Sequence, residues 1–311
     1  MQLVHDFLEI RLQRYERLPH APVMTGIKSP TVRHRRLARE LRRHRERAGL
    51  TTEAASDRLG WSRTKLVRFE AARTRPTPAD VGAALDLYGA DLPERAALME
   101  LARQARQRGW WTAYSDVFQS SFVALEDEAS SIHAWHPQVI PGLLQTDAYA
   151  HAVISAADEN VDRTTWERRL QARLARRALL SRPAAPTLHA VLDEAVIRRS
   201  PTTPGVMAEQ LLSLVAAARR PNITLQVMPF SAGMHSGLDS GFVVLGYSEP
   251  EDPSVAYIET IGGELYVESS IHVDRITMSF ERIRNAAWSP GESVAFIAAT
   301  AKEVSRHGEH A

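Results

Sequence analysis

The sequence predicts two domains of different fold class: an all-α N-terminal domain of five helices and an α+β C-terminal domain. The chain has 311 residues, which is enough for two domains. Between residues 31 and 108, short runs with helical periodicity alternate with capping residues, and this pattern indicates consecutive helices. Beyond residue 109, runs rich in β-branched and aromatic residues appear among further helical stretches, and these indicate strands.

The five N-terminal helices are separated by residues that begin or end helices. Thr51 and Ser62 are good N-caps, while Gly49 and Gly60 are of the residue type that ends a helix. Pro76 prevents the third helix from continuing. The helices are expected at residues 31–48, 51–60, 62–75, 77–89 and 93–109.

The second domain alternates between the two kinds of element. Helices are expected at residues 120–132, 145–156, 163–180, 208–218 and 269–288. Strands are expected at residues 187–192, 223–228, 241–247, 255–259 and 264–267. The resulting regions are an N-terminal extension (1–30), a helix-turn-helix domain (31–108), an α+β effector- or partner-binding domain (109–300) and a flexible tail (301–311). Whether Met1 or Met24 is the native start stays open.

Composition and charge narrow the possible functions. The absence of Cys excludes disulfides, Cys-based zinc sites and a Cys nucleophile. No run of about 18 apolar residues and no signal-peptide core is present, so we expect a cytoplasmic protein without membrane contact. Residues 31–75 hold 14 Lys and Arg against 5 Asp and Glu, a net +9, while the remainder of the chain has a net −8. A basic segment on an acidic body favours a nucleic-acid module, although a merely solvated basic helix would give the same count.

The second and third helices, joined by a tight turn at Gly60, have the arrangement of a helix-turn-helix. The N-terminal side chains of such a second helix reach base edges in the major groove. We expect Leu66, Val67 and Phe69 to pack inward. The candidates for DNA contact are Thr51, Thr52, Ser62, Arg63, Thr64, Lys65, Arg68, Arg73 and Arg75.

Residues 31–89 resemble the Xre/Cro/CI family of helix-turn-helix domains. The matching positions are Leu50, Thr51, Leu59, Gly60, Ser62, Arg63, Leu66, Arg68, Glu70 and Pro76. The resemblance implies a structural ion pair between Arg45 and Glu70. Thr52 stands where the family usually has a phosphate-contacting Gln, and Ala72 stands where it usually has Gly. Because one helix reads few base pairs, we also expect a homodimer on two half-sites.

The region from about 109 to 297 resembles the C-terminal domain, of unassigned biochemical function, that many actinobacterial regulators of this type carry. The residues that carry the resemblance include PGLLQT (141–146) and the pair Asp193 and Glu194. A usage of 35 Arg against 3 Lys fits such a GC-rich genome. The resemblance implies that a small neighbour-encoded protein is a possible partner. We expect PGLLQT to form a structural turn into a helix.

No catalytic residue, metal site or cofactor is expected. Glu126, Asp127 and Glu128 are interpreted as a solvated helix face. Asp193 and Glu194 are interpreted as a cap and an ion-pair partner of Arg198 or Arg199; with Glu259 they would be the acids of an enzyme if the strands brought them together. His133 and His136 have the spacing of two metal ligands on a helix, but Pro137 disfavours a helix there.

Three functions follow in order of preference. The first is a sequence-specific double-stranded DNA-binding transcriptional regulator, associated with the nucleoid, whose C-terminal domain senses a small-molecule ligand or docks a protein. The second is an antitoxin-like DNA-binding partner of a small neighbour-encoded protein. The third is an enzyme delivered to DNA. A deep pocket with convergent carboxylates would favour the third, and a mostly apolar pocket would favour ligand sensing.

Overall fold

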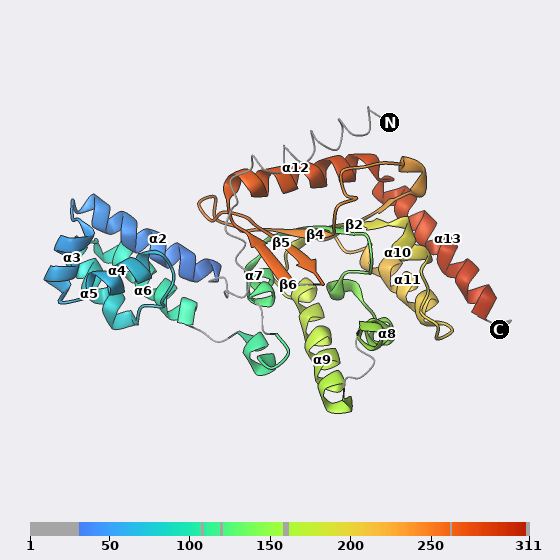
Figure 1. The fold of residues 1–311 in the computed structure, drawn as a ribbon, viewed down its shortest axis with the longest axis horizontal. Coiled ribbons are helices and arrows are strands. Elements are labelled where there is room, and N and C mark those ends of the chain that lie inside the picture. The colour runs from blue at the N-terminus through green and yellow to red at the C-terminus, as the bar shows by residue number, and fades with distance from the viewer. Residues whose placement is uncertain (1–30, 107–108, 119–120, 158–161, 262, 309–311) are drawn as a thin grey trace, which may run out of the picture.

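The computed structural model describes residues 31–106, 109–118, 121–157, 162–261 and 263–308. The predicted fold class is confirmed, because a helical N-terminal region precedes a region with helices and a six-stranded sheet. In Figure 1 the helical domain lies at one end of the molecule and the sheet domain at the other. The predicted N-terminal extension and the choice between Met1 and Met24 lie outside the described residues.

All five predicted helices of the N-terminal domain are present. Thr31, Thr51, Ser62 and Thr77 cap four of them, each accepting a hydrogen bond from a backbone N–H of the first turn. Leu37, Leu41, Leu66, Val81 and Leu85 share one buried core. The helices are α2 (Val32–Arg47), α3 (Thr52–Leu59), α4 (Arg63–Glu70), α5 (Pro78–Tyr88) and α6 (Leu92–Arg106).

The C-terminal domain is built on one mixed sheet of strand order β3-β2-β1-β4-β5-β6. The strands β1, β2 and β3 are parallel, whereas β4, β5 and β6 continue antiparallel from β1. Their bounds are β1 (Ser131–His136), β2 (Thr187–Asp193), β3 (Ile223–Met228), β4 (Phe242–Gly246), β5 (Val255–Thr260) and β6 (Gly263–Val267).

The central strand β1 is one of the elements that the sequence pattern did not indicate. The helix predicted at 120–132 ends at Glu128, as α7 (Phe122–Glu128), and Ser131–His136 is a strand. Ile132 and Ala134 face one layer while Trp135 faces the other, and all three are buried. Ser131 to Ala134 alternate polar and apolar, but Trp135 breaks the pattern because helices also cover the second face of the sheet. The alternation is therefore too short to indicate a strand.

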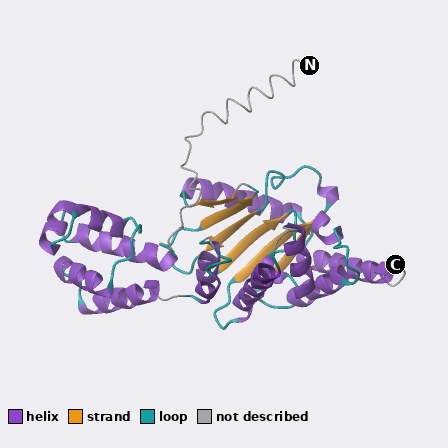
Figure 2. Cartoon of the chain, turned by 60° about the horizontal axis from the view of Figure 1, so that its bottom comes forward, coloured by secondary structure: helices purple, strands orange, loops and turns teal. Residues whose placement is uncertain are grey.

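Helices cover both faces of the sheet (Figure 2). The helix α12 (Ser270–Ala286) covers one face, where Trp135 and Phe280 pack together. A larger core with Ile132, Leu192 and Ile297 lies on the opposite face. The other helices of this domain are α8 (Asp147–Ala157), α9 (Arg163–Arg176), α10 (Glu194–Arg198), α11 (Val206–Ala217) and α13 (Pro290–Gly308).

The prediction of a flexible tail from residue 301 is wrong as far as residue 308, because these residues form the last turns of α13. Ile297 and Ala301 of this helix are 0% and 1% exposed, respectively. Ser289 and Glu292 form reciprocal side-chain-to-backbone hydrogen bonds at its start. This capping box begins a helix that the sequence pattern did not indicate.

Candidate functional site

The helix-turn-helix is formed by α3 and α4, which lie on either side of Gly60. Gly60 has φ 66°, a left-handed conformation that costs glycine little. Trp61 follows it and packs edge-on against Phe69 of α4, with 5.6 Å between the ring centroids. The turn thus fixes the angle at which α4 leaves α3.

The outer face of α4 consists of side chains that follow helical spacing. Arg63, Thr64, Val67 and Arg68 are all exposed, three or four residues apart along one stripe. Val67 was expected to pack inward, but it is 43% exposed. Only Leu66 and Phe69 of this helix are buried, since they alone point to the core. An exposed Val beside two arginines adds a group that can contact a thymine methyl.

Two of the predicted contact residues are held by acids within the domain. Lys65 Nζ lies 2.8 Å from Asp80 Oδ1 and 4.3 Å from the centre of the Trp61 ring. Arg63 Nε lies 2.7 Å from Glu53 Oε1, and both of these side chains are more than half exposed. Lys65 is therefore less available to DNA than its sequence position indicated, whereas Arg63 can exchange Glu53 for another partner at the surface.

The predicted hydroxyl contacts are helix caps. The Thr51 hydroxyl accepts a hydrogen bond from the Ala54 N–H at 3.1 Å, and the Ser62 hydroxyl accepts one from the Lys65 N–H at 3.2 Å. Both side chains are exposed, and the half-buried Thr52 is the first residue of α3. A capping hydroxyl keeps its own hydrogen available for donation to a phosphate.

Four basic side chains between residues 51 and 75 form no salt bridge with any described residue. Arg68, Arg73 and Arg75 are among the predicted contacts. The fourth, Arg58 in the last turn of α3, was missed by the sequence analysis. The sequence feature that could have identified Arg58 is its position in the last turn of α3, just before the turn at Gly60. These four arginines are the cations with which the domain can neutralise phosphates.

Arg45 and Glu70 come together beneath this surface. Two hydrogen bonds of 2.7 and 2.9 Å join the Arg45 guanidinium to the Glu70 carboxylate, and each side chain is 8% exposed. A further bond of 2.7 Å runs from Arg45 Nη1 to the Leu50 carbonyl oxygen. Hydrogen bonding to Glu70 raises the pKa of Arg45 further. The pair ties α2 to the end of α4.

The end of α4 has a strained residue. The N–H of Ala72 donates to the Phe69 carbonyl and the N–H of Arg73 to the Arg68 carbonyl, which is the Schellman pattern. Ala72 has φ 53°, in the left-handed region that glycine usually occupies. The alanine found at this position therefore adopts the conformation that a glycine would adopt, at a steric cost.

The helix α2 also contacts the C-terminal domain. Arg36 Nε lies 3.0 Å from Asp252 Oδ2, and Arg39 Nη2 lies 2.9 Å from Asp252 Oδ1. The Asp252 side chain is only 1% exposed. Arg33 and Glu128 form a third contact at 3.6 Å. One helix thus supports the helix-turn-helix with its C-terminal half and contacts the sheet domain with its N-terminal half.

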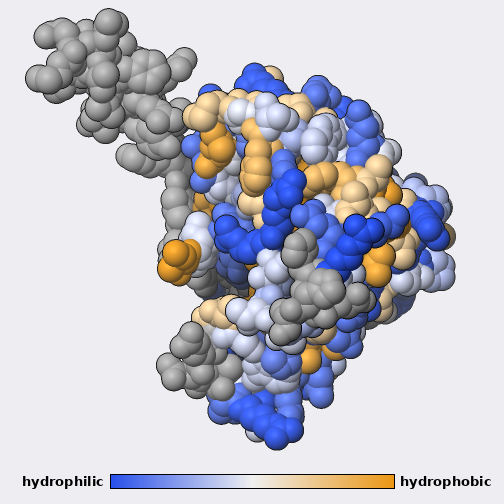
Figure 3. Space-filling model, turned by 90° about the vertical axis from the view of Figure 1, so that its right-hand side faces the viewer, coloured by the Kyte–Doolittle hydropathy of each residue, from blue (hydrophilic) through white to orange (hydrophobic). Residues whose placement is uncertain are grey.

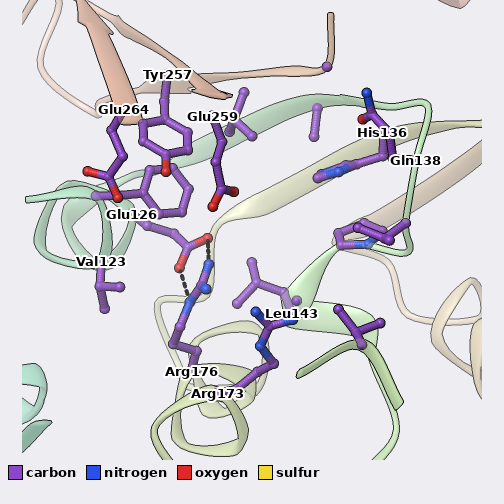
Figure 4. A pocket seen from close by; sticks show the side chains of 18 of the residues that line it. Val123, Glu126, His136, Gln138, Leu143, Arg173, Arg176, Tyr257, Glu259 and Glu264 are labelled. Carbon is purple, nitrogen blue, oxygen red and sulfur yellow. Dashed lines mark hydrogen bonds and ion pairs between the residues drawn. The ribbon is translucent and has the colours of Figure 1, made fainter. Parts of the chain in front are cut away.

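The C-terminal domain has a large cleft of about 1570 Å³ beside β1, β5 and β6 (Figure 4). Alternation along the strands turns Tyr257, Glu259 and His136 toward it. From the opposite side, α9 contributes Arg173 and Arg176. The cleft combines apolar walls with charged groups, so neither of the two pocket types anticipated from the sequence describes it fully.

The acidic residues of α7 are not a solvated face, and this interpretation is wrong. Glu126 is 3% exposed and forms hydrogen bonds of 2.8 and 3.0 Å with Arg176. Asp127 pairs with Arg182 at 3.1 Å, and the Glu128 side chain is 6% exposed. Burial raises the pKa of Glu128. The segment is short and lies between the sheet and α9, which the sequence pattern could not indicate.

The acids of the enzyme alternative do not share the cleft. The Asp193 carboxylate accepts from the Ala195 N–H at 2.8 Å, and Glu194 pairs with Arg198 at 2.6 Å. These are the capping and ion-pairing roles expected for them. Glu259 is the only one of the three among the cleft-lining residues in the described chain.

Neither His133 nor His136 lies on a helix. Both are in β1, and because they are three residues apart, their side chains lie on opposite faces of the sheet. His133 stacks on Phe280 with 4.9 Å between ring centroids. Burial lowers the pKa of His136 to about 4. Within the part of the chain that is described, no group of three His, Asp or Glu side chains is placed to hold a metal ion.

The PGLLQT segment forms the predicted turn into a helix, since a short 3-10 turn over Gly142–Leu144 leads into α8. The buried Gln210 of α11 holds it with two hydrogen bonds, to the Thr146 N–H at 2.7 Å and to the Leu144 carbonyl at 2.8 Å. Its Gln145 side chain also lines the cleft. The segment is thus both a turn and a rigid wall of the cleft.

Comparison with known families agrees with this division of the molecule. Residues 36–98 match a helix-turn-helix domain, and residues 119–299 match a domain of unknown function (DUF5753). No curated protein and no solved structure matches the chain. In the described residues, no helix is long and apolar enough to cross a membrane. The helix-turn-helix indicates a DNA-binding regulator. Because the larger match spans more than half of the sequence, the chain belongs to the DUF5753 family, with a helix-turn-helix domain ahead of the family domain.

Proposed function

We propose that this protein is a sequence-specific, Xre/Cro/CI-type transcriptional regulator whose C-terminal domain binds a small ligand. The observation that carries the proposal is the exposed stripe of Arg63, Thr64, Val67 and Arg68 on α4. It offers two guanidinium groups for guanine edges and two groups that can contact a thymine methyl. The unpaired Arg58, Arg73 and Arg75 add phosphate contacts around it.

The ligand-binding part rests on the cleft and on its connection to α2. Glu126, which lines the cleft, and Glu128, which contacts Arg33, are two residues apart on α7. A ligand in the cleft would therefore lie beside the same short helix that touches α2. Such a ligand can change DNA affinity only if it binds more tightly to one arrangement of α7 and α2 than to another, and if the two arrangements differ in DNA affinity.

We further propose that the protein acts as a homodimer on two half-sites at the nucleoid, and that the C-terminal domain binds its ligand without transforming it. The second proposal is supported by the engagement of Asp193, Glu194 and Glu126 in caps and ion pairs.

A protein partner is the alternative to a small ligand. The surface at the far end of the C-terminal domain mixes apolar and hydrophilic side chains (Figure 3). In the segment after β3, Phe230, Met234 and Leu238 are 59%, 89% and 55% exposed. Exposed apolar side chains of this kind are found at protein-binding surfaces.

The decisive experiment is selection of binding sites from a random double-stranded DNA library with the full-length protein. We expect one enriched motif with two half-sites about 34 Å apart. Arg63→Ala combined with Arg68→Ala should lose the motif and weaken binding to it about 100-fold, at about 1–3 kcal/mol for each contact. Arg163→Ala combined with Arg306→Ala, which removes the same charge elsewhere, should leave both unchanged. A motif retained by the α4 variant would refute the assignment of the recognition helix.

A further inference from the structure

Several of the charged groups in the cleft form ion pairs or hydrogen bonds with neighbouring side chains. Glu126 and Arg176 form a bidentate pair whose side chains are 4% and 15% exposed. Arg168 pairs with Asp116 at 3.0 Å on the outer wall. The Tyr266 hydroxyl donates to Glu264 at 3.0 Å. Because these groups already have partners, we do not expect them to bind the charged groups of a ligand.

Arg173 is the exception on the α9 side. Its Nη1 donates to Gln145 Oε1 at 2.8 Å, and it has no carboxylate within salt-bridge distance among the described residues. Its remaining nitrogens are not sealed from solvent either, so they face the cavity. Burial and the neighbouring Arg176 lower the pKa of Arg173, while the carboxylate of Glu259 acts in the opposite direction. A guanidinium in this situation is a receptor for a carboxylate.

Gln145 sets the direction of this guanidinium. Its amide nitrogen donates to the Ile140 carbonyl at 2.7 Å, and its amide oxygen therefore points at Arg173. The side chain of Gln145 is 2% exposed, so it does not move freely. An arginine that is already oriented loses less entropy when it binds an anion.

The side chains of two acidic residues in the lining, Glu259 and Asp239, form no hydrogen bond or salt bridge with another described residue. Of these two, Glu259 acts electrostatically on Arg173, and it extends from β5 toward the helices in Figure 4. Arg173 is within reach of its electrostatic field but not in contact with it. The two side chains line the same cleft without forming a salt bridge, so a molecule bound there can meet a cation at one end and an anion at the other.

Apolar side chains also line the cleft. Leu143, Val153 and Ile154 contribute aliphatic side chains from the PGLLQT turn and α8, and Phe122 and Tyr257 contribute rings. His136 lies at the end of β1 in the same cavity, and its low pKa keeps it neutral at pH 7. Apolar side chains beside polar groups that orient a ligand are usual in small-molecule sites.

We propose that the cleft binds an apolar zwitterion of the amino-acid or short-peptide class, with its carboxylate on Arg173 and its amine on Glu259. This inference rests on the proposed ligand-binding role of the C-terminal domain. The apolar side chains of the ligand pack against the aliphatic and aromatic side chains of the cleft.

The test is calorimetric titration of the full-length protein, without DNA, with leucyl-leucine and with free leucine. The N-acetylated dipeptide lacks the amine and the dipeptide amide lacks the carboxylate, and each should bind at least about 10-fold more weakly than leucyl-leucine, or about 1.4 kcal/mol. In Arg173→Gln the dipeptide and its amide should bind equally, and in Glu259→Gln the dipeptide and its acetylated form should bind equally. Arg173→Lys, which keeps the charge, should still bind the dipeptide more tightly than its amide, by a smaller factor than the unaltered protein does.

Matched controls keep the result interpretable. Arg219→Gln and Glu209→Gln change the same residue types on exposed sites outside the cleft and should bind as the unaltered protein does. Failure of both zwitterions to bind, or equal binding of the blocked forms to the unaltered protein, would overturn the inference. Because DNA is absent, this result is independent of the DNA selection. Binding of the dipeptide without any effect on DNA affinity would instead contradict the sensing role.

Discussion

The arginines of α2 and those around α4 have the same charge but differ in whether an acidic side chain pairs with them. Each of the eight arginines of α2 lies 3.6 Å or closer to an acidic oxygen. Arg58, Arg68, Arg73 and Arg75 have no such partner among the described residues. The net charge of residues 31–75 therefore overstates the charge available to DNA. Pairing within the molecule decides which basic residues can bind phosphates.

The location of the acids explains this difference. Glu128, Asp252 and Glu268 belong to the C-terminal domain, and they meet α2 where the two domains touch. A buried carboxylate needs a cation, because removal of its water is otherwise costly. The surface of α3 and α4 faces no acidic domain, so its cations remain exposed.

The largest effect is expected from Glu70→Ala. This change leaves the Arg45 guanidinium buried without its carboxylate, and a broken buried pair costs about 3–5 kcal/mol. Urea unfolding of the full-length protein followed by tryptophan fluorescence measures the loss. Glu100→Ala, which removes an exposed acid paired with Arg103, should leave the unfolding midpoint unchanged. Equal midpoints for the two variants would show that the Arg45–Glu70 pair is not structural.

Asp252→Asn should have the second largest effect, because it removes the charge shared by Arg36 and Arg39. The two arginines are 28% and 34% exposed and regain some hydration, so we expect a loss of about 2 kcal/mol, below the range for a fully buried pair. The same urea titration measures it. Glu251→Gln, at 61% exposure, is the control and should not differ from the unaltered protein. A loss as small as that of the control would mean that α2 is not held by this contact.

Arg73→Ala combined with Arg75→Ala tests the unpaired arginines directly. We expect DNA affinity to fall about 10-fold for every sequence, and the slope of log affinity against log salt to become shallower by about 2, or about 0.9 for each lost phosphate contact. Fluorescence anisotropy at several salt concentrations measures both. The matched variant Arg42→Ala with Arg47→Ala loses the same charge from paired residues and should keep the original slope. Similar slopes for the two variants would show that the paired and the unpaired arginines contribute equally to DNA binding.

Acid should weaken the junction between α2 and the segment after α4. His34 is buried, with Nε2 3.2 Å from the Thr74 carbonyl oxygen, and burial lowers its pKa below 6.5. The folded state therefore disfavours the protonated ring, so its contribution to stability is present above pH 6.5 and is lost as the pH falls below that value. His34→Gln should make the decline of stability below pH 6.5 less steep. An unchanged pH profile would show that His34 titrates as an exposed residue does.

Ala72→Gly should have the smallest effect and the opposite sign. It relieves a left-handed alanine at a cost of about 1–2 kcal/mol, offset in part by the greater entropy of glycine in the unfolded chain. We expect a net stabilisation of about 0.5–1 kcal/mol, seen as a higher melting temperature with unchanged DNA affinity. Destabilisation would mean that the buried Ala72 methyl group contributes more than the backbone strain costs.

The helices of the N-terminal domain could be predicted from the sequence because their signals are local. Thr51, Gly60 and Ser62 act within one turn of their own positions. The strand β1 was not predicted, because its alternation ends after four residues at Trp135, which is buried on the other face. The positions of Glu126 and Val67 were also predicted wrongly, since burial depends on packing against distant elements such as α9 and on the angle of α4.

The two fold classes, the capped helices, the turn at Gly60 and the arginines of α4 could be predicted from the sequence. These features depend on residue type and spacing within a few positions. In contrast, folding of the whole chain sets which arginines remain unpaired, joins α2 to the C-terminal domain through Asp252, and brings Arg173 and Glu259 to one cleft. Electrostatic partners separated by tens to hundreds of residues are set by the packing of the whole chain, and no local pattern records them.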